Sequence, residues 1–384
     1  MKIVIVCDSF KESLSSLSVA EEVEAGFRAV FPAVECISLP VADGGEGTVD
    51  ALVHATAGQF RLHHVTGPMG DLVQARYGVL GDGRTAVIEM AAAAGLDLVP
   101  RAVRDPRIAT TFGLGQLILH ALDSGCRRFI LGLGGSATND GGAGMAQALG
   151  VRLLDQNEQE LPPGGAALQA LARIDTSALD PRLGECVFEI ACDVDNPLTG
   201  EHGASTVFGP QKGATPDMVA LLDTALIRFG EALEALGSTG IMTAPGAGAA
   251  GGLGAGASVF LGAKLRPGVD IVLDALALDT ALVGADLVIT GEGRLDGQTA
   301  RGKTPVGVAR LARQHGVPVI ALAGALGAGY EAVYDHGISA VFSVVNRPCL
   351  LEEALADARP NIRGTARNIA ALLALSPKDV LSPA

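Results

Sequence analysis

The chain has 384 residues, 48% of them hydrophobic and 18% charged, and a length of about 100–200 residues per domain predicts two or three globular domains. Its formal net charge of −14 repels phosphate backbones and anionic lipid headgroups, so neither nucleic acid nor a membrane surface is expected as a partner. The 51 glycines, roughly 13% against a typical ~7%, indicate many tight turns and close backbone approaches.

The six cysteines form no CxxC pair and most lie in apolar runs, so we expect buried thiols in a reducing compartment. The charge of Asp8 interrupts the first apolar run, which is not typical of a signal peptide, and a cytoplasmic protein is expected. The uncharged stretch 235–263 holds nine glycines and Pro245, too many to cross a membrane. It is expected to be a loop or a flexible connector.

Short apolar runs alternate with segments of helical period along the chain, which indicates βαβ units and an α/β fold. The first part is expected to contain a strand at 3–7, a helix from the Ser18–Glu21 capping box to before Pro32, a strand at 36–39 and a helix from Gly44-Gly45 to about residue 57. Between 63 and 90 the pattern changes to short alternating runs with glycine turns, which predicts a domain boundary near residue 62.

The same rhythm returns near Asp286 after a long middle section. The expected elements are a helix at 111–123, strands at 128–133 and 187–192, a helix at 217–236, a strand in DLVIT, a helix after Pro305, and strands at 317–322 and 340–345. We therefore expect one discontinuous domain, 1–62 with 284–384, interrupted by a second α/β domain at 63–283. Two crossovers between the domains predict an active site in the cleft between them.

Polar, glycine-bearing segments follow five of the apolar runs, at the position where ligands bind in open parallel sheets. They begin at Asp8, Asp43, Gly135, Asp193 and Gly291. A single Asp after a strand is as well explained as a helix cap, and that alternative stays open for each one. Five such segments together favour a functional site.

The segment Gly134–Gly144 is either a strained turn or an anion site, because its hydroxyls and backbone amides precede a helical stretch. Phosphate or carboxylate binding is the favoured interpretation. Only six of the 28 basic residues are lysines. Three of them, Lys11, Lys212 and Lys303, lie beside turn residues, where an ammonium group could reach a phosphate. The alternative is that each is an ordinary exposed surface residue.

The stretch Gly297–Thr304 matches the P-loop pattern GxxxxGK[ST]. A true P-loop is not expected, because the charged segment Gly291–Asp296 separates it from the preceding strand and Pro305 falls where the helix begins. Lys303 near a helix N-terminus can still contact a phosphate.

Other chemistries lack their motifs: there is no HExxH, no cysteine–histidine cluster, no GxSxG, and no GxGxxG after the first strand. Carboxylates, lysines and glycine-rich loops remain. That set suits phosphoryl transfer with Mg²⁺ on carboxylates and cations on phosphates.

Seven segments resemble, in order, the bacterial type-1 glycerate kinases. They are DSFKESLSS, ADGGEGT, GGSATNDGG, ACDVDNPLTG, FGPQKGA, GAGAAGGLG and ITGEGRLDGQTARGKTP. The resemblance covers nearly the whole chain and implies ATP-dependent phosphorylation of D-glycerate to 2-phosphoglycerate. It also implies a flavodoxin-like domain interrupted by a restriction-endonuclease-like α/β domain. Two departures are Glu12, where many relatives have Gly, and Cys7-Asp8 in place of Pro-Asp.

Our hypothesis is that a glycerate hydroxyl attacks the γ-phosphorus of ATP·Mg²⁺ in line. Asp193 is the first candidate for the base and Asp43 the second. We assign Glu292 and Asp296 to the metal, and Lys11, Lys212 and Lys303 to phosphates, with Lys11 among the catalytic residues. Arg294 is assigned to the substrate carboxylate or to a developing phosphate charge. The residues assigned to substrate or phosphate binding are Asp8, Ser136, Thr138, Asn139 and Asp140.

The expected partners are D-glycerate and ATP, and a homodimer is left open. A non-catalytic binder of small organic acids would share the cleft and the anion loops, and a nucleotide-dependent ligase would use a second co-substrate. Phosphorylation at position 3, or of another small hydroxy acid, also stays open.

Overall fold

The computed structural model describes residues 1–41 and 47–375, and of Arg301 only the backbone. The chain divides into two compact units: unit 1 comprises residues 1–43 and 272–384, and unit 2 comprises residues 44–271. These limits come earlier in the chain than the predicted ones at 62/63 and 283/284. The reason is that helix α2 (Thr48–Ala55) and strand β3 (Gln59–Thr66) pack with the strands of unit 2.

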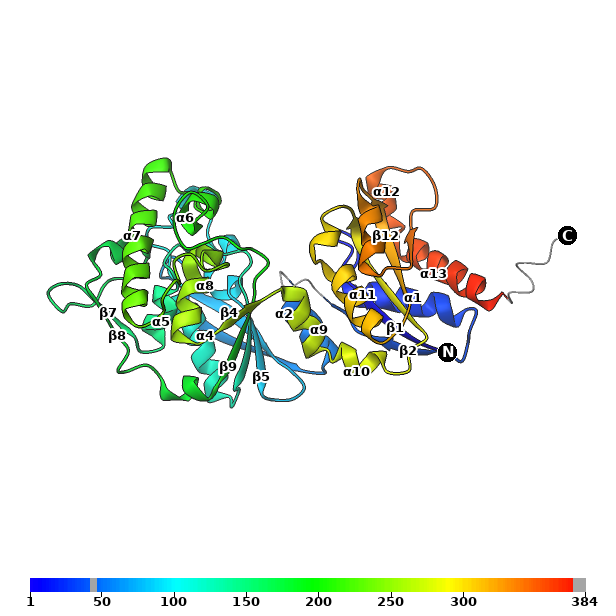
Figure 1. The fold of residues 1–384 in the computed structure, drawn as a ribbon, viewed down its shortest axis with the longest axis horizontal. Helices are drawn as coiled ribbons and strands as arrows, with labels where there is room; N and C mark the ends of the chain where they lie inside the picture. The colour runs from blue at the N-terminus through cyan, green and yellow to red at the C-terminus, as the bar shows by residue number, and fades with distance from the viewer. Residues whose placement is uncertain (42–46, 376–384) are drawn as a thin grey trace. The chain divides into compact units, whose positions relative to one another are not determined.

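Unit 1 is built on a five-stranded sheet in which every pairing is parallel (Figure 1). The order is β13-β12-β11-β1-β2, with β1 at Lys2–Cys7, β2 at Glu35–Ser38, β11 at Leu287–Leu295, β12 at Val319–Leu326 and β13 at Ala340–Ser343. Counted within the unit this is the 2-1-3-4-5 order of flavodoxin-like sheets. The predicted α/β class is confirmed.

Helices cover this sheet because its strands are apolar on both faces. Ile3 and Ile5 of β1 pack with α1 (Ser16–Arg28) and α13 (Ala358–Ala374), while Val4 and Val6 are buried on the other face. Ser15, one turn before the predicted Ser18, caps α1 by accepting from the Ser18 amide. The other helices and turns related to this unit are α9 (Gly268–Ala275, across the changeover), α10 (Leu278–Leu282), η6 (Thr299–Arg301), α11 (Thr304–Gln314), η7 (Tyr330–His336) and α12 (Leu351–Ala356).

Unit 2 holds a six-stranded mixed sheet in the order β10-β9-β6-β5-β4-β3. Strands β5, β6, β9 and β10 are parallel, whereas β3-β4-β5 form an antiparallel meander. The bounds are β4 Leu72–Val79, β5 Thr85–Glu89, β6 Arg128–Gly132, β9 Val187–Ala191 and β10 Lys264–Arg266, with β7 (Arg152–Leu154) and β8 (Arg173–Asp175) forming a separate pair.

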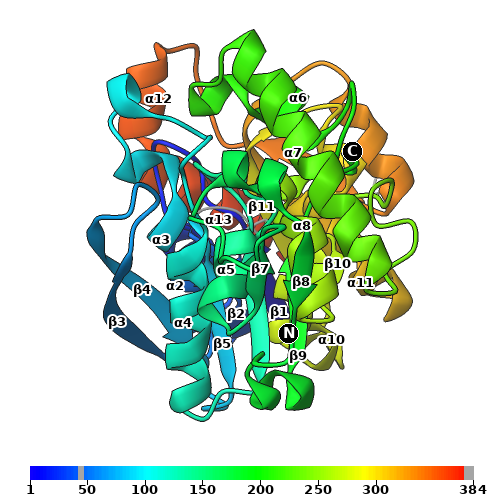
Figure 2. The same cartoon turned by 90° about the vertical axis from the view of Figure 1, so that its left-hand side faces the viewer.

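The helices of unit 2 lie in layers on its sheet (Figure 2). α4 (Phe112–Asp123), α5 (Ala143–Ala148) and α8 (Ala249–Phe260) lie between the sheet and the outer helix α7 (Pro216–Ala235). The remaining short elements are α3 (Ala91–Ala94), η1 (Leu96–Leu98), η2 (Arg101–Val103), η3 (Gly165–Ala170), η4 (Pro181–Glu185), α6 (Ala204–Phe208) and η5 (Pro210–Lys212).

The glycine-rich stretch 235–263 is not the loop that was expected, because helix α8 occupies its second half and is almost wholly buried. Its glycines allow close packing against another backbone. A Cβ on Gly251 would lie 2.1 Å from the Thr138 carbonyl oxygen, and one on Gly256 would lie 2.2 Å from that of Gly141. The expectation failed because glycine here serves contact between segments rather than flexibility.

Two further observations bear on the sequence-based expectations. All six cysteines are free thiols, with Cys7 and Cys126 buried and the others partly buried. Within residues 1–41 and 47–375, no helix combines the length and the apolar character that a membrane span requires.

Candidate functional site

The order of strands in unit 1 brings two carboxylates together that are 284 residues apart in sequence. From β1 the chain proceeds to β2 on one side, and from β11 it proceeds to β12 on the other, so the connections diverge between β1 and β11. Ligands of open parallel sheets bind at such a switch point, outside the carboxyl ends of the strands. Asp8 directly follows β1 there, and Glu292 lies on the adjacent β11.

Hydroxyl and ammonium groups surround these carboxylates at the start of α11. Thr304 Oγ1 donates to Asp8 Oδ2 at 3.1 Å, and Thr299 Oγ1 donates to Glu292 Oε1 at 2.6 Å. Lys303 Nζ lies 3.4 Å from Glu292 Oε2. The structure therefore gathers three predicted site residues, Asp8, Glu292 and Lys303, in one cluster, together with the hydroxyl of Thr304 that the sequence analysis had not singled out.

The elements on either side of the P-loop-like stretch Gly297–Thr304 resemble those of a P-loop more closely than expected. β11 continues to Leu295, so only one residue separates the strand from the pattern, and α11 begins at Thr304. The predicted interruption by a charged loop is wrong, because Gly291–Leu295 goes on pairing with β12. However, the amides of Thr299 and Lys303 bond to carbonyls of the same loop, and Gly302 caps the η6 turn. In a P-loop such amides face the phosphates.

The electrostatics of Glu292 suit a bound cation. Its side chain is buried, and burial is the main cause that raises its pKa above the usual range, with the negative charge of Asp8 adding to the effect. No group of three or more His, Cys, Asp or Glu side chains that could hold a metal occurs in the described part of the chain. Mg²⁺ is commonly held by one or two carboxylates plus substrate phosphates and water, and a carboxylate pair beside a hydroxyl fits that donor set.

The other residues predicted near this edge lie in different surroundings. Asp296, the second metal candidate, pairs with Arg294 at 3.2 Å between Oδ2 and Nε, and its Oδ1 accepts from the amide of Gln298. Arg294 is well exposed, as is Lys11 on the loop after β1. Glu12 beside it has a φ of +63°, a left-handed conformation that glycine adopts more readily than glutamate.

In unit 2 the loop after β6 is exposed at Gly134 and Gly135 and enclosed from Ser136 to Asp140. Asp140 is fully buried and accepts four hydrogen bonds, from the amide and hydroxyl of Thr111 and from the amides of Gly142 and Gly144. Burial nevertheless raises its pKa. This carboxylate ties the loop to the start of α4, and its assignment to substrate stays a prediction.

The neighbouring side chains of that loop are also inside the protein. Lys212 is 1% exposed and donates from Nζ to the carbonyl of Thr138 at 2.6 Å. Burial lowers its pKa to about 7, although the charge of Asp140 opposes the shift. Asn139 Nδ2 donates to Ser205 Oγ, whereas Asn139 Oδ1 and Thr138 Oγ1 are buried without a hydrogen-bond partner. Ser136 is also buried.

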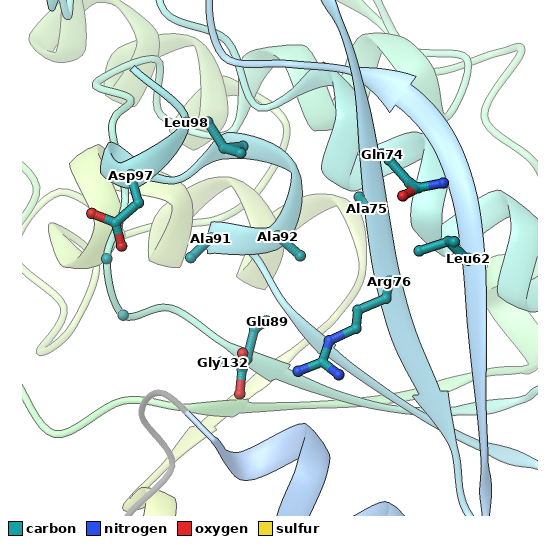
Figure 3. Close-up of a pocket in the computed structure, with 12 residues that line it drawn as sticks. Leu62, Gln74, Ala75, Arg76, Glu89, Ala91, Ala92, Asp97, Leu98 and Gly132 are labelled. Atoms are coloured by element: carbon teal, nitrogen blue, oxygen red, sulfur yellow. The ribbon is translucent and has the colours of Figure 1, made fainter. Parts of the chain in front are cut away.

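A pocket of about 440 Å³ opens in unit 2 at the carboxyl ends of β5 and β6 (Figure 3). Its lining comprises Leu62, Gln74, Ala75, Arg76, Glu89, Ala91, Ala92, Asp97, Leu98, Gly132, Gly134 and Gly135. The sequence analysis missed Arg76 and Glu89. Glu89 ends an apolar run as the other strand-tip carboxylates do, but an alanine-rich segment without glycine follows it directly, so the pattern did not mark it.

Asp193, the first base candidate from the sequence, is not among the described residues that line this pocket. Asp193, two residues after β9, is exposed, and its Oδ1 accepts from the amide of Gly268 at the start of α9. It therefore acts as a cap of a helix distant in sequence. Asp43 lies outside the described residues.

Comparisons with known proteins agree over nearly the whole chain. The model of the glycerate kinase family matches residues 3–374. A glycerate kinase of Bacillus subtilis is 56% identical over 377 residues, which is 98% of each chain. The glycerate 2-kinase of Escherichia coli is 52% identical over 379 residues, covering 99% of this chain and 100% of the other. A solved structure of a glycerate kinase 2 from Salmonella typhimurium LT2 superimposes with a TM-score of 0.90 at 55% identity, covering 97% and 98%.

Proposed function

Because this chain belongs to the glycerate kinase family, we propose that it transfers the γ-phosphoryl group of ATP to D-glycerate and forms 2-phospho-D-glycerate. The position of transfer is supported by the similarity to a protein named glycerate 2-kinase. The observation that carries the proposal in this chain is the cluster of Asp8, Glu292, Lys303 and Thr304 at the switch point of the parallel sheet.

Three members of that cluster have roles that phosphoryl transfer requires: Lys303, Glu292 and Asp8. The ammonium group of Lys303 binds phosphate oxygens, aided by the positive N-terminus of α11. Glu292 with Asp8 would hold Mg²⁺, which would supply neutralisation of the phosphate charge. Asp296, the other predicted metal carboxylate, keeps Arg294 in position, and Arg294 is exposed for the charge that develops on the transferred phosphoryl group.

The loop after β6 acts through its backbone in this proposal. Thr138, Asn139 and Asp140 are fully buried, so their contribution is to fix the course of the loop, with Lys212 holding the Thr138 carbonyl. Its glycines present main-chain amides to an anion. Lys11, at the exposed loop after β1, is a second cation for phosphate.

The first experiment is incubation of the purified protein with ATP, Mg²⁺ and D-glycerate, with ³¹P NMR of the product. A resonance of 2-phosphoglycerate supports the full proposal. 3-Phosphoglycerate keeps the kinase and overturns the position of transfer. ADP formed only with another hydroxy acid changes the substrate, and no acceptor-dependent ADP from folded protein refutes the proposal.

The sequence-derived base is tested by Asp193→Asn. If Asp193 takes the proton of the attacking hydroxyl, turnover falls by about 10²–10⁴-fold while the KM values stay within a few-fold. If it only caps α9, turnover stays within about threefold and the melting temperature falls instead. Steady-state kinetics and thermal melting on one preparation distinguish the two outcomes.

A further inference from the structure

Among the described residues that line the pocket at the ends of β5 and β6, one is a cation and two are carboxylates, and apart from Gln74 the others are apolar or glycine. The ionisable residues among those lining it are Arg76, Glu89 and Asp97. A small hydroxy acid needs a cation for its carboxylate and hydrogen-bond acceptors for its hydroxyls. This inventory matches such a ligand better than a polyphosphate, which would meet two negative charges for each positive one.

Two contacts hold the guanidinium group of Arg76 in place and leave some of its N–H donors available. Its Nη2 lies 2.6 Å from Asp50 Oδ2, and its guanidinium carbon lies 4.9 Å from the centre of the Phe60 ring. These contacts occupy one edge and one face of the planar group and leave other N–H donors for a ligand. Arg76 and Glu89 point toward the same part of the pocket (Figure 3).

Glu89 has the environment of a proton acceptor. It is the last residue of β5, and its Oε1 accepts from the amide of Val49 at 3.2 Å. Burial and the charge of Asp50 on α2 raise its pKa, while Arg76 on β4 opposes them. Asp97 on η1 is a further acidic group in the same lining. A carboxylate with a raised pKa is a better general base near neutral pH than an ordinary one.

The volume leaves room for the phosphoryl group that glycerate would receive. A water molecule takes up about 30 Å³ in the liquid, so 440 Å³ corresponds to about 15 groups of that size. Glycerate has about seven non-hydrogen atoms. Gly134 lies on the lining, and a Cβ built there would have no atom within 4 Å. Backbone open on that side lets a phosphoryl group come close to the acceptor.

We propose that this pocket is the acceptor site, in which Arg76 binds the carboxylate of the hydroxy acid and Glu89 accepts the proton of the hydroxyl that is phosphorylated. The inference rests on the proposed function. In the step, the hydroxyl oxygen forms a bond to the γ-phosphorus, the bond from that phosphorus to the β,γ-bridging oxygen breaks, and ADP leaves with the electron pair. The hydroxyl proton passes to Glu89, which later returns it to water.

Binding can be measured directly, because the chain contains no tryptophan and a single introduced one reports alone. Leu98→Trp places the indole on the lining, and Leu62→Trp on the edge strand β3 is a second reporter if the first variant does not fold. Leu72→Trp, exposed on β4 and outside the lining, is the matched control. D-glycerate should change the emission of the pocket reporters and leave that of the control unchanged.

Two variants then separate binding from proton transfer. In a reporter background, Arg76→Ala should weaken D-glycerate binding by about 10–100-fold, the range for loss of a charge-assisted contact. Glu89→Gln should keep D-glycerate binding within about threefold but lower kcat by about 10²–10⁴-fold. In the wild type, protonation of Glu89 should lower kcat on the acid limb of the pH profile. This decrease should be absent in Glu89→Gln. Glu231→Gln, the same chemical change at an exposed position of α7, should keep both kcat and that limb.

The outcomes against the inference are distinct from failure of the proposed function. If ADP changes the reporters and D-glycerate does not, the pocket takes the nucleotide, and the inference is overturned while the kinase activity stands. Retained kcat in Glu89→Gln with loss in Asp193→Asn also overturns it. If the unaltered protein forms no ADP with D-glycerate, the proposed function fails instead, whatever the reporters show.

Discussion

Replacement of Lys212 by methionine should change how the stability of unit 2 depends on pH. The ammonium group is enclosed, and Asp140, whose negative charge acts on it, already accepts four other hydrogen bonds. Burial lowers the pKa of Lys212 from 10.5 to about 7, so the folded protein loses this proton long before the unfolded chain does. Methionine has a similar length and no proton to lose.

The magnitude follows from proton linkage. Between pH 7 and 10.5 the unfolded chain binds one more proton at this position than the folded protein, so the free energy of unfolding rises with pH by about 1.4 kcal/mol per unit. This contribution is complete above pH 10.5 and is lost as the pH falls to 7. Between pH 7.5 and 9.5 the wild type should therefore gain about 2–3 kcal/mol relative to Lys212→Met.

The assay is urea unfolding followed by circular dichroism at both pH values. Comparison with the variant cancels every other group that titrates in this range. Lys264→Met, at an exposed position of β10 in the same unit, measures the effect of removing a solvated ammonium group. Parallel pH dependences for wild type and Lys212→Met would refute the reasoning, because they would mean that Lys212 keeps its proton in the folded protein.

Two other substitutions test the cluster on β11 and the tract on α8. Lys303→Ala should raise the KM for ATP by about 10-fold with kcat within about 10-fold, as loss of one phosphate contact predicts, whereas a loss of kcat above about 10³ would indicate a P-loop lysine. Gly251→Ala should lower the free energy of unfolding by 3 kcal/mol or more, roughly the sum of left-handed strain at φ +73° and the 2.1 Å approach to the Thr138 carbonyl. Gly262→Ala, at φ +60° with nothing within 4 Å, should cost only about 1–2 kcal/mol in the same urea titration, and equal costs would refute the packing argument.

The parts of the fold that the sequence predicts are those whose signal is local. The run 3–7 became β1, and the helical period at 111–123 became α4, because burial of one face imposes its own spacing on the residues. The end of β11 was misjudged for the opposite reason. Gly291–Leu295 carries glycine and charge, and it is a strand only because β12 supplies a partner as far as Leu326.

The sequence predicts several residues of the candidate site but not which of them lie close together. Asp8 and Glu292 were both singled out, yet their proximity depends on β11 inserting beside β1, which no local pattern reports. From the sequence, Asp296 is as good a metal ligand candidate as Glu292. The structure shows that Asp296 forms an ion pair with Arg294. Arg76 was missed because it lies within a strand and not at its end, and Glu89 because an alanine-rich segment follows it directly; both line the same pocket.

The place of β1 in the middle of its sheet has a consequence for the newly made chain. Its neighbour β11 is far away in sequence, as the bond from the Lys2 amide to Asp286, 284 residues on, illustrates. At about 5–20 residues per second, a ribosome needs roughly 15–60 s to supply that neighbour. Unit 2, continuous from 44 to 271, is complete before then and can fold first. Throughout that interval the strand Lys2–Cys7 has one unpaired edge, so nascent unit 1 presents an apolar strand to chaperones and to other chains.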